Sequence, residues 1–409
     1  MKACSRQIDL SPSMPVWMSG YMTENRLSPA EGIHDAPQAN AVLLETEGGR
    51  LLWVVMDVIS VPEEATAPLR EALSHEFDLS KENILISGIH SHSCPGGFMD
   101  ESAFGHPEGL DYRQEAIEKV IEGLKGMADE LQEVKAEIAT GKVSGYYSKR
   151  TDITAPYDDS FTLIRFINPQ DKTVAAWLNF NCHATVVGPQ NMLLTADLIG
   201  AIRERAQKQL GIAPLTFTGA SGDISNRQYR QGNDFAELDR VADGLWAQMS
   251  SQLDFTPIHL NLENIESYEY RIACNPQDQK EDYERYLAAA LKVLEDPNST
   301  FDERKMAITE KLLSEDRLKM EWIDFAVKGK VLHLEDLTIV TFPGELACTF
   351  GLQLKAKKKT PYFLMAGYTE DYQGYFIEQE EYGRTYETKA SMTPKGETEK
   401  IIQRIGEYL

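Results

Sequence analysis

The chain has 409 residues, of which 42% are hydrophobic and 26% are charged, proportions that are ordinary for one large or two smaller globular domains. The formal net charge of −23 at pH 7 argues against nucleic acid and anionic lipid surfaces as partners. No apolar run approaches the roughly 18 residues that a transmembrane helix needs, so no transmembrane segment is expected.

The beginning of the chain shows no targeting signal. Residues 1–10 lack the apolar stretch of a secretory signal peptide. The 5 cysteines are odd in number and lack CxxC spacing, which is typical of free thiols in a reducing compartment. These features predict a cytoplasmic protein.

Strand-like and helix-like segments alternate through most of the length. The nearly continuous apolar run at 51–56 is typical of a strand covered on both faces, and a polar helical stretch follows at 63–75. Apolar residues at helical spacing predict a further helix over 116–131. The other predicted strands are 84–89, 161–167, 173–180, 215–218 and 337–342, and the other predicted helices are 197–210, 235–253 and 401–409.

One segment, from about 275 to 328, differs from this alternation. It is rich in Glu, Lys, Asp, Leu and Ala, has helical periodicity, and is interrupted by the breaker sequence DPNST at 296–300. We expect a helical hairpin inserted between two strands. The predicted fold class is therefore α/β, with residues 1–409 forming a single large domain of mixed sheets flanked by helices and carrying this helical insertion.

The first reactive patch follows the predicted strand at 84–89. His90 and His92 lie two residues apart just before the sequence CPGG at 94–97, and side chains at i and i+2 of a strand point to the same side. The chain has only 8 histidines, so two at a strand end suggest metal ligands or proton shuttles. A pair of loop histidines satisfied by backbone and water is the alternative.

Four further patches place polar side chains directly after strand-like runs. His183 follows one such run, where a lone histidine is more often a structural hydrogen-bonding group than a ligand. The small residues at 219–225 form a tight turn that either cradles an oxyanion or exposes Ser225. Glu345 follows a Pro-Gly turn as a ligand, a general base or a residue of a first helical turn. The last patch is a cluster of tyrosines, typical of the wall of a cleft, at positions 368, 372, 375, 382 and 386.

Taken together, these patches fit a zinc site. Histidine and glutamate supply N and O ligands, and a ligand set without thiolates is typical of catalytic zinc with an open position for water. Catalytic zinc lowers the pKa of bound water toward ~7. The sequence therefore predicts Zn²⁺ as the cofactor.

The patches also occur in the same order as the motifs of the neutral, non-lysosomal ceramidase family. The resemblance extends from GIHD at 32–35 to YE at 386–387. The segment from Tyr375 to Tyr386 is similar to the tyrosine block of that family. The other motifs are HSHSCPGG at 90–97, which resembles HTHSGPGG; NCHAT at 181–185, which resembles the second histidine motif; GDIS at 222–225, which resembles GDVS; and FPGE at 342–345, which resembles PGE.

The resemblance implies which residues bind the metal. It assigns zinc ligation to His90, His183, Glu345 and Tyr375. Tyr372 is the alternative to Tyr375 in this role.

The resemblance also implies three catalytic residues. His92 would polarise the amide carbonyl or shuttle a proton, and it is our candidate for the general acid that protonates the leaving amine. Arg150 would hold the substrate oxygen, and Tyr386 is a further active-site tyrosine. The implied substrate-binding residues are Ser225, Arg150, Gly96 and Gly97.

The implied reaction is hydrolysis of the linear amide bond of an N-acyl lipid or ceramide-like sphingolipid, with metal-activated water as nucleophile. The expected partner is therefore a small-molecule N-acyl substrate. One alternative is a zinc esterase, or an amidase acting on a different small acyl compound. A second alternative, from another class, is a non-catalytic binding protein with a structural metal site.

Several positions depart from the pattern of the family. Cys94 stands where a glycine is usual, and Asn226 replaces the common proline after GDIS. Tyr386 is one residue closer to Tyr375 than is usual, and the insertion at 275–328 is expected to reshape the entrance to the site. The larger enzymes of the family carry a secretory signal and a C-terminal β-sandwich domain, and neither is visible here. We therefore weigh an N-acyl compound other than ceramide as substrate.

Overall fold

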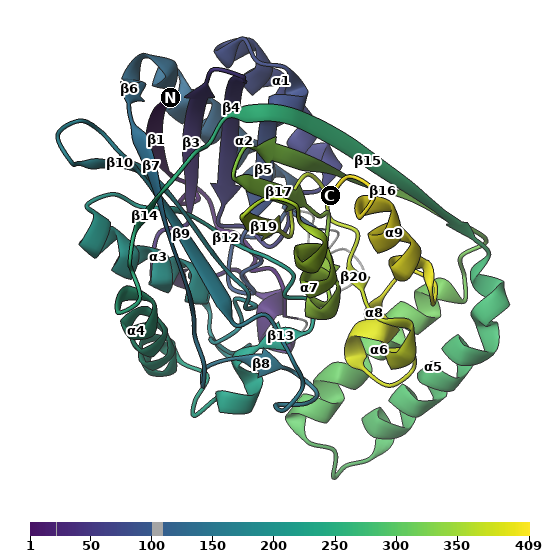
Figure 1. The fold of residues 1–409 in the computed structure, drawn as a ribbon. Coiled ribbons are helices and arrows are strands. Elements are labelled where there is room, and N and C mark those ends of the chain that lie inside the picture. Colours follow the sequence, from purple (N-terminus) through teal and green to yellow (C-terminus); the bar gives the residue numbers. More distant parts are fainter. Residues whose placement is uncertain (22, 100–108) are drawn as a thin grey trace.

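Most strands of the protein belong to three sheets with helices on their outer faces (Figure 1). The computed structural model describes residues 1–21, 23–99 and 109–409. The first sheet has the order β5-β4-β3-β1-β6, in which β4 and β5 are parallel and the β1–β3 and β3–β4 pairs are antiparallel. Its strands are β1 (Lys2–Asp9), β3 (Gln38–Thr46), β4 (Gly49–Met56), β5 (Ile84–Gly88) and β6 (Gln132–Glu133).

The second sheet has the order β12-β10-β9-β7-β14, with β10 and β12 parallel. It packs face to face with the first sheet, and the rings of Trp53 and Phe217 meet between them at 4.3 Å. Its strands are β7 (Lys135–Lys142), β9 (Ser160–Ile167), β10 (Thr173–Phe180), β12 (Leu215–Thr218) and β14 (Thr256–Ile258).

Strand β4 shows how the sequence pattern produces these layers. Leu51, Trp53 and Val55 face the second sheet, whereas Leu52 and Val54 face the helices on the other side. Successive side chains of a strand point to opposite faces, so a strand covered on both sides is apolar throughout. The helices that cover the first sheet are α1 (Glu63–Phe77) and α2 (Leu110–Leu124), and those beside the second sheet are α3 (Asp197–Leu210) and α4 (Phe235–Ser250).

The third sheet has the order β15-β16-β17-β19, with β17 and β19 parallel. Helices α7 (Cys348–Lys357) and α9 (Glu397–Ile405) pack on it around a separate apolar cluster. Its strands are β15 (Leu262–Cys274), β16 (Ile323–Leu334), β17 (Leu337–Thr341) and β19 (Tyr362–Ala366). Two-residue strands form three small pairs: β2 (Gly32–Ile33) with β11 (Leu193–Leu194), β8 (Ser148–Lys149) with β13 (Ile224–Ser225), and β18 (Glu345–Leu346) with β20 (Tyr375–Phe376).

The insertion is a helical hairpin between two neighbouring antiparallel strands, β15 and β16, as the sequence predicted. Helix α5 (Lys280–Glu295) and helix α6 (Phe301–Arg317) extend away from the sheet (Figure 1). Thr300 caps α6 through a capping box with Glu303, which explains why the chain turns at 296–300. The predicted insertion is too long at its end, because residues 323–328 already belong to β16.

The mixed α/β fold class is confirmed, and several elements lie where the sequence places them, including β10, β12 and α3. The helix predicted over 116–131 is wrong at its end, because α2 stops at Leu124 and Gly126 adopts a φ of 67° before a short 3-10 helix, Met127–Glu130. All 5 cysteines have free thiols, as expected. Within the described ranges, no helix is both long and apolar enough to cross a membrane.

A buried ion pair ties α3 to the end of β4. Arg203 donates from Nη1 and Nη2 to the two carboxylate oxygens of Asp57, at 2.7 and 2.6 Å, and the backbone amide of Gln38 donates to the same carboxylate at 2.9 Å. Asp57 is fully buried. Bidentate geometry satisfies both charges, so removal of one partner would leave the other charge buried and unpaired.

We expect Asp57→Ala to lower the free energy of unfolding by about 3–5 kcal/mol, because it leaves the Arg203 guanidinium buried without its carboxylate partner. Urea denaturation measures this loss. The matched control is Glu45→Ala, which removes a partly exposed partner of Lys2 and Arg50 and should cost less than about 1 kcal/mol. Equal losses in the two variants would contradict the role given to the Asp57–Arg203 pair.

Candidate metal centre and active site

The parallel strands of the three main sheets end at one place in the molecule. His90 and His183 lie in the loops after β5 and β10, and Glu345 begins β18 shortly after β17. Backbone hydrogen bonds join these loops, since Gly88 N donates to Tyr368 O at 2.9 Å and Gly367 N donates to Thr218 O at 3.0 Å. Residues more than 250 positions apart in the chain are therefore brought together at the carboxyl ends of parallel strands, where α/β proteins place their sites.

His90 and His92 converge, although not for the reason that the sequence suggested. Strand β5 ends at Gly88, and His90 adopts a left-handed φ of 60° instead of continuing the strand. The turn brings the Nε2 atoms of His90 and His92 to 3.2 Å from each other, and the His90 ring stacks on Tyr368 at 4.2 Å. A left-handed backbone at a non-glycine residue is typical of functional sites that the surrounding structure holds in place.

Two backbone carbonyls fix the orientation of the buried imidazoles. His90 Nδ1 lies 2.8 Å from Ile59 O, and His183 Nδ1 lies 2.7 Å from Ser221 O. A carbonyl oxygen only accepts hydrogen bonds, so each ring carries its proton on Nδ1 and turns the Nε2 lone pair toward the centre. Metal-binding histidines are commonly oriented in this way.

The carboxylate of Glu345 completes the group. Its Oε2 atom lies 2.9 Å from His183 Nε2 and 3.4 Å from His90 Nε2. Both His183 Nε2 and Glu345 Oε2 are buried and have no hydrogen-bond partner among the described residues. Neighbouring ligand atoms of tetrahedral zinc are about 3.3 Å apart when the bonds are about 2.0–2.1 Å, which matches this spacing. Two buried atoms without a hydrogen-bond partner among the described residues, together with His90 Nε2, fit a cation.

The charge state of the cluster agrees with this geometry. Burial, followed by the positive charge of Arg150, lowers the pKa of His183 to about 4, so the ring is neutral at neutral pH. Burial opposes ionisation of Glu345, but the neighbouring His90 and His183 outweigh it and hold the pKa of the carboxyl well below its usual range. An ionised carboxylate beside a neutral imidazole is the form that binds a metal.

His92 lies at the boundary between the cluster and the cavities. It is half-buried, whereas His90 and His183 are buried, and its Nε2 atom faces His90. The ligand atoms of His90, His92 and His183 all lie within 4.8 Å of one another. The geometry therefore admits His92 either as a further ligand or as the predicted proton donor beside the metal.

Two tyrosines adjoin Glu345, and they differ in their contacts. Tyr375 is paired with Glu345 in register through β18 and β20, and its hydroxyl lies 3.4 Å from Arg150 Nη1. Tyr372 donates to Glu345 Oε1 at 2.5 Å, on the oxygen that does not face the histidines. Tyr372 thus orients the carboxylate, and ligation by Tyr375 stays a prediction.

Arg150 follows β8 and lies in the site, where it forms an ion pair with Glu387 that the sequence did not predict. Its Nη1 atom lies 2.9 Å from Glu387 Oε1. Burial disfavours the charge, but Tyr375 and Glu387 outweigh it and raise the pKa of Arg150 well above its usual range. The only signal for Glu387 in the sequence was its place beside Tyr386.

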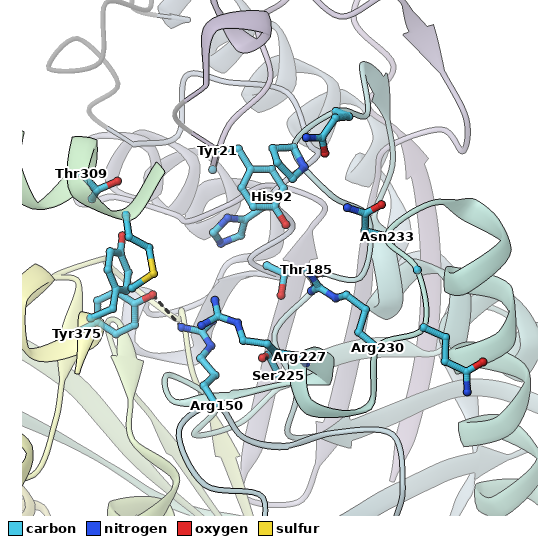
Figure 2. A pocket seen from close by; sticks show the side chains of 17 residues that line it. Tyr21, His92, Arg150, Thr185, Ser225, Arg227, Arg230, Asn233, Thr309 and Tyr375 are labelled. Atoms are coloured by element: carbon cyan, nitrogen blue, oxygen red, sulfur yellow. Dashed lines mark hydrogen bonds between the residues drawn. The ribbon is translucent and has the colours of Figure 1, made fainter. Parts of the chain in front are cut away.

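Two cavities meet at the cluster. The first, of about 850 Å³, is polar, and Figure 2 shows His92, Arg150, Ser225 and Tyr375 around it. The second, of about 680 Å³, is lined by His90 and Glu345 and by many apolar side chains. The residues that line both cavities are Gly20, Tyr21, His92, Thr309, Tyr375 and Tyr386.

The remaining predicted residues fall into two groups. Ser225 and Tyr386 line the polar cavity. Gly96 and Gly97 are not among the described residues that line either cavity. Gly97 instead has a φ of 101° and lies so close to Gly109 that a Cβ atom would be 2.1 Å from the Gly109 carbonyl oxygen.

Cys94 is buried and donates from Sγ to Ser91 O at 2.9 Å, which gives it a structural contact in the histidine loop.

Comparisons with known proteins agree with the resemblance seen in the sequence. Residues 10–212 match the family model described as neutral/alkaline non-lysosomal ceramidase, N-terminal. The chain is 24% identical over 239 residues to a neutral ceramidase of Oryza sativa subsp. japonica, covering 52% of this chain and 30% of that protein. It is 24% identical over 211 residues to the neutral ceramidase of Drosophila melanogaster, covering 46% of this chain and 29% of that protein. The matched segment thus spans less than a third of the length of these relatives.

The fold is also similar to a solved structure, the neutral ceramidase from Pseudomonas aeruginosa. The TM-score is 0.74 and the sequence identity is 16%, and the match covers 100% of this chain and 75% of that one. At this identity the likeness concerns the fold. The similarity in fold continues beyond residue 212 and includes the third sheet and the segment after it that contains Glu345.

The cluster predicts the effect of removing single ligands. We expect His90→Ala, His183→Ala and Glu345→Ala each to abolish stoichiometric zinc binding, because each removes one of the converging donor atoms. We expect His92→Ala to keep zinc. Elemental analysis of the purified, folded variants measures the metal content, and His75→Ala on the exposed face of α1 is the matched control. Zinc retained by His90→Ala would refute the ligand set, and zinc lost from His92→Ala would add this residue to it.

The lowered pKa of His183 predicts a pH response of the metal-free protein. The folded pKa of about 4 lies below the ordinary 6.5, so the unfolded chain takes up a proton first as the pH falls. The contribution of His183 to stability is therefore complete above pH 6.5 and is lost on acidification toward pH 4. We expect nuclear magnetic resonance to show the His183 ring neutral, with its proton on Nδ1, down to pH ~5. A titration midpoint near 6.5 would show that the ring is not held as described.

Proposed function

Because residues 10–212 belong to the neutral/alkaline non-lysosomal ceramidase family, we propose that the chain is a zinc-dependent hydrolase that cleaves the linear amide bond of an N-acyl substrate. One observation carries the proposal. The donor atoms of His90, His183 and Glu345 converge beside His92, which lines both the polar and the apolar cavity, and two of them, His183 Nε2 and Glu345 Oε2, have no hydrogen-bond partner among the described residues. An amide that joins an acyl chain to a polar amine fits such a junction.

The donor set favours zinc. It consists of imidazole nitrogens and a carboxylate oxygen without thiolate, which is typical of catalytic zinc sites. Zinc bound there supplies a Lewis acid for the amide carbonyl and lowers the pKa of its bound water toward ~7. His90 and Glu345 line the apolar cavity, so the donor group is open to a ligand on that side.

The residues around the cluster carry out proton transfer, stabilisation of negative charge and contact with the substrate. His92 lines both cavities, and from there its imidazole protonates the amine as it leaves. Arg150 lines the polar cavity and is held by Glu387, so that it stabilises negative charge on the carbonyl oxygen during attack. Tyr386 lies between the two cavities and contacts the bound amide.

The apolar cavity holds the acyl chain in this proposal. Its walls include Ile59 and Met99 from the N-terminal half, and Trp322 and Phe325 from β16 and the residue before it. Leu313 of α6 also lines it, so the inserted hairpin forms part of the acyl site. Burial of an alkyl chain there contributes about 0.8 kcal/mol per CH₂ group.

Two alternatives use the same residues. An esterase would use the same cluster on an acyl ester, and only its choice of leaving group would differ. A binding protein with a structural metal site is less well supported, because structural zinc sites are closed by protein ligands, whereas His90 and Glu345 of this cluster line the apolar cavity.

Hydrolysis of a matched amide and ester pair tests the proposal. We expect zinc-loaded protein to release the amine from an N-dodecanoyl amide, and chelator-treated protein to release none until zinc is returned. His92→Ala should keep its zinc but lower kcat about 10²–10⁴-fold, because it removes the proton donor. Chromatographic detection of the amine and the fatty acid measures the reaction.

The controls separate the alternatives. His75→Ala, a histidine on the surface of α1, should hydrolyse the amide like the unaltered protein. Cleavage of the dodecanoyl ester without the amide would favour the esterase. Tight binding of both compounds by zinc-loaded protein without any turnover would overturn hydrolysis in favour of a binding function.

A further inference from the structure

The polar cavity has an unusual charge for this chain. Its described lining residues include Arg150, Arg227 and Arg230 but no Asp or Glu, although the sequence has 64 acidic and only 41 basic residues. In Figure 2 the three arginine side chains lie on one side of the cavity, with Ser225 and Thr185 between them and His92 above. The apolar cavity, in contrast, includes several carboxylates at its wall.

Two of the three guanidinium groups are not neutralised within the protein. Arg150 is paired with Glu387. Arg230 donates from Nη2 to Thr185 O at 2.7 Å and to Asn226 Oδ1 at 3.0 Å, and both acceptors are uncharged. Within the described part of the chain, no ion pair involves Arg227 or Arg230, whereas Arg203, Arg205, Arg165, Arg240 and Arg271 each pair with a carboxylate.

The positive charges act on one another. Partial desolvation, followed by the positive charges of Arg150 and Arg230, lowers the pKa of Arg227 although the carboxylate of Glu387 opposes this shift. Arg227 and Arg230 are exposed, so solvent screens part of this repulsion and both guanidinium groups are accessible to a ligand in the cavity. The arrangement is therefore that of an anion site.

The local backbone holds the two arginines in place. Ser225 Oγ accepts a hydrogen bond from Arg227 N and caps the short 3-10 helix Asn226–Tyr229 that carries Arg227. Asn226 is fully buried, and its Oδ1 atom holds the Arg230 side chain. Asn226 thus supports Arg230 at the wall of the cavity.

We propose that the polar cavity binds an anionic group, a carboxylate or a phosphate, on the amine half of the amide substrate, through Arg227 and Arg230. This inference rests on the proposed hydrolase function. The guanidinium fork matches the geometry of carboxylate and phosphate oxygens, and such charge-assisted hydrogen bonds are the strong ones. The amine half of ceramide carries hydroxyl groups and an alkyl chain but no anionic group, so the inference gives this chain a substrate class of N-acyl amino acids or N-acyl amine phosphates.

Matched substrate pairs test the anion. We compare N-dodecanoyl glycine with N-dodecanoyl glycinamide, and N-dodecanoyl ethanolamine phosphate with N-dodecanoyl ethanolamine, on the zinc-loaded protein. We expect kcat/KM for at least one anionic member to exceed that of its neutral partner by about tenfold or more. The pair with the larger ratio identifies carboxylate or phosphate as the source of the charge. Equal hydrolysis within both pairs would overturn the anion site and leave the hydrolase function standing.

Binding of uncleavable isosteres keeps the two proposals separate. In these compounds a CH₂ group replaces the amide NH, and calorimetry measures their dissociation constants. If no amide is cleaved but an acidic isostere still binds about tenfold more tightly than its neutral partner, the anion site stands and the hydrolase proposal fails. If the acidic and neutral isosteres bind equally, the anion site is refuted whatever the hydrolysis shows.

Single substitutions assign the effect to the two arginines. We expect Arg227→Gln and Arg230→Gln each to reduce the anionic-to-neutral ratio several-fold, and the double variant to bring it close to one. Arg285→Gln makes the same change of charge on the exposed face of α5, outside both cavities, and should leave the ratio unaltered. A ratio that falls equally in Arg285→Gln would mean that overall charge, and not the cavity, determines the preference.

Discussion

The site depends on the way two backbone carbonyls hold two imidazole rings. Ile59 O belongs to the loop after β4 in the first sheet, and Ser221 O belongs to the loop after β12 in the second. Each carbonyl fixes the Nδ1 proton of one histidine and thereby directs one Nε2 lone pair to a common point. The segment that follows β17 of the third sheet contributes the carboxylate of Glu345 to the same point. The relative position of the three sheets therefore sets the geometry of the donor atoms, and the buried Asp57–Arg203 pair, two residues before Ile59, steadies one side of it.

The fold was readable from the sequence where burial imposes a simple pattern. Strand β10 and helix α3 begin and end where the periodicity indicated, because the first is buried on both faces and the second covers a sheet. The two strands that flank the insertion were expected, but the ranges of β15 and β16 were not predicted, since alternating polar residues on a half-exposed sheet resemble the adjoining helical insertion in composition. The first strand, β1, was missed for a similar reason, because polar Ser5, Arg6 and Gln7 interrupt it.

The site was only partly readable. His90, His183 and Glu345 were found because each follows a strand-like run, and the structure brings the three together. The left-handed turn at His90 and the Arg150–Glu387 pair were not found, because both depend on contacts between segments distant in sequence. Arg227 and Arg230 were also missed. They differ from most other arginines in having no carboxylate partner among the described residues, and a sequence does not show which carboxylates the fold brings near an arginine.

Because of where the α5–α6 hairpin is attached, the hairpin can change without a change in the sheets that hold the donor atoms. The hairpin leaves the third sheet between β15 and β16, which are already neighbours, so its length does not alter the pairing of any strand. Yet Met306, Thr309 and Leu313 of α6 reach the cavities beside the cluster. Evolution can therefore lengthen, shorten or replace this wall, and with it the shape of both cavities, while the donor atoms of the cluster stay where the three sheets hold them.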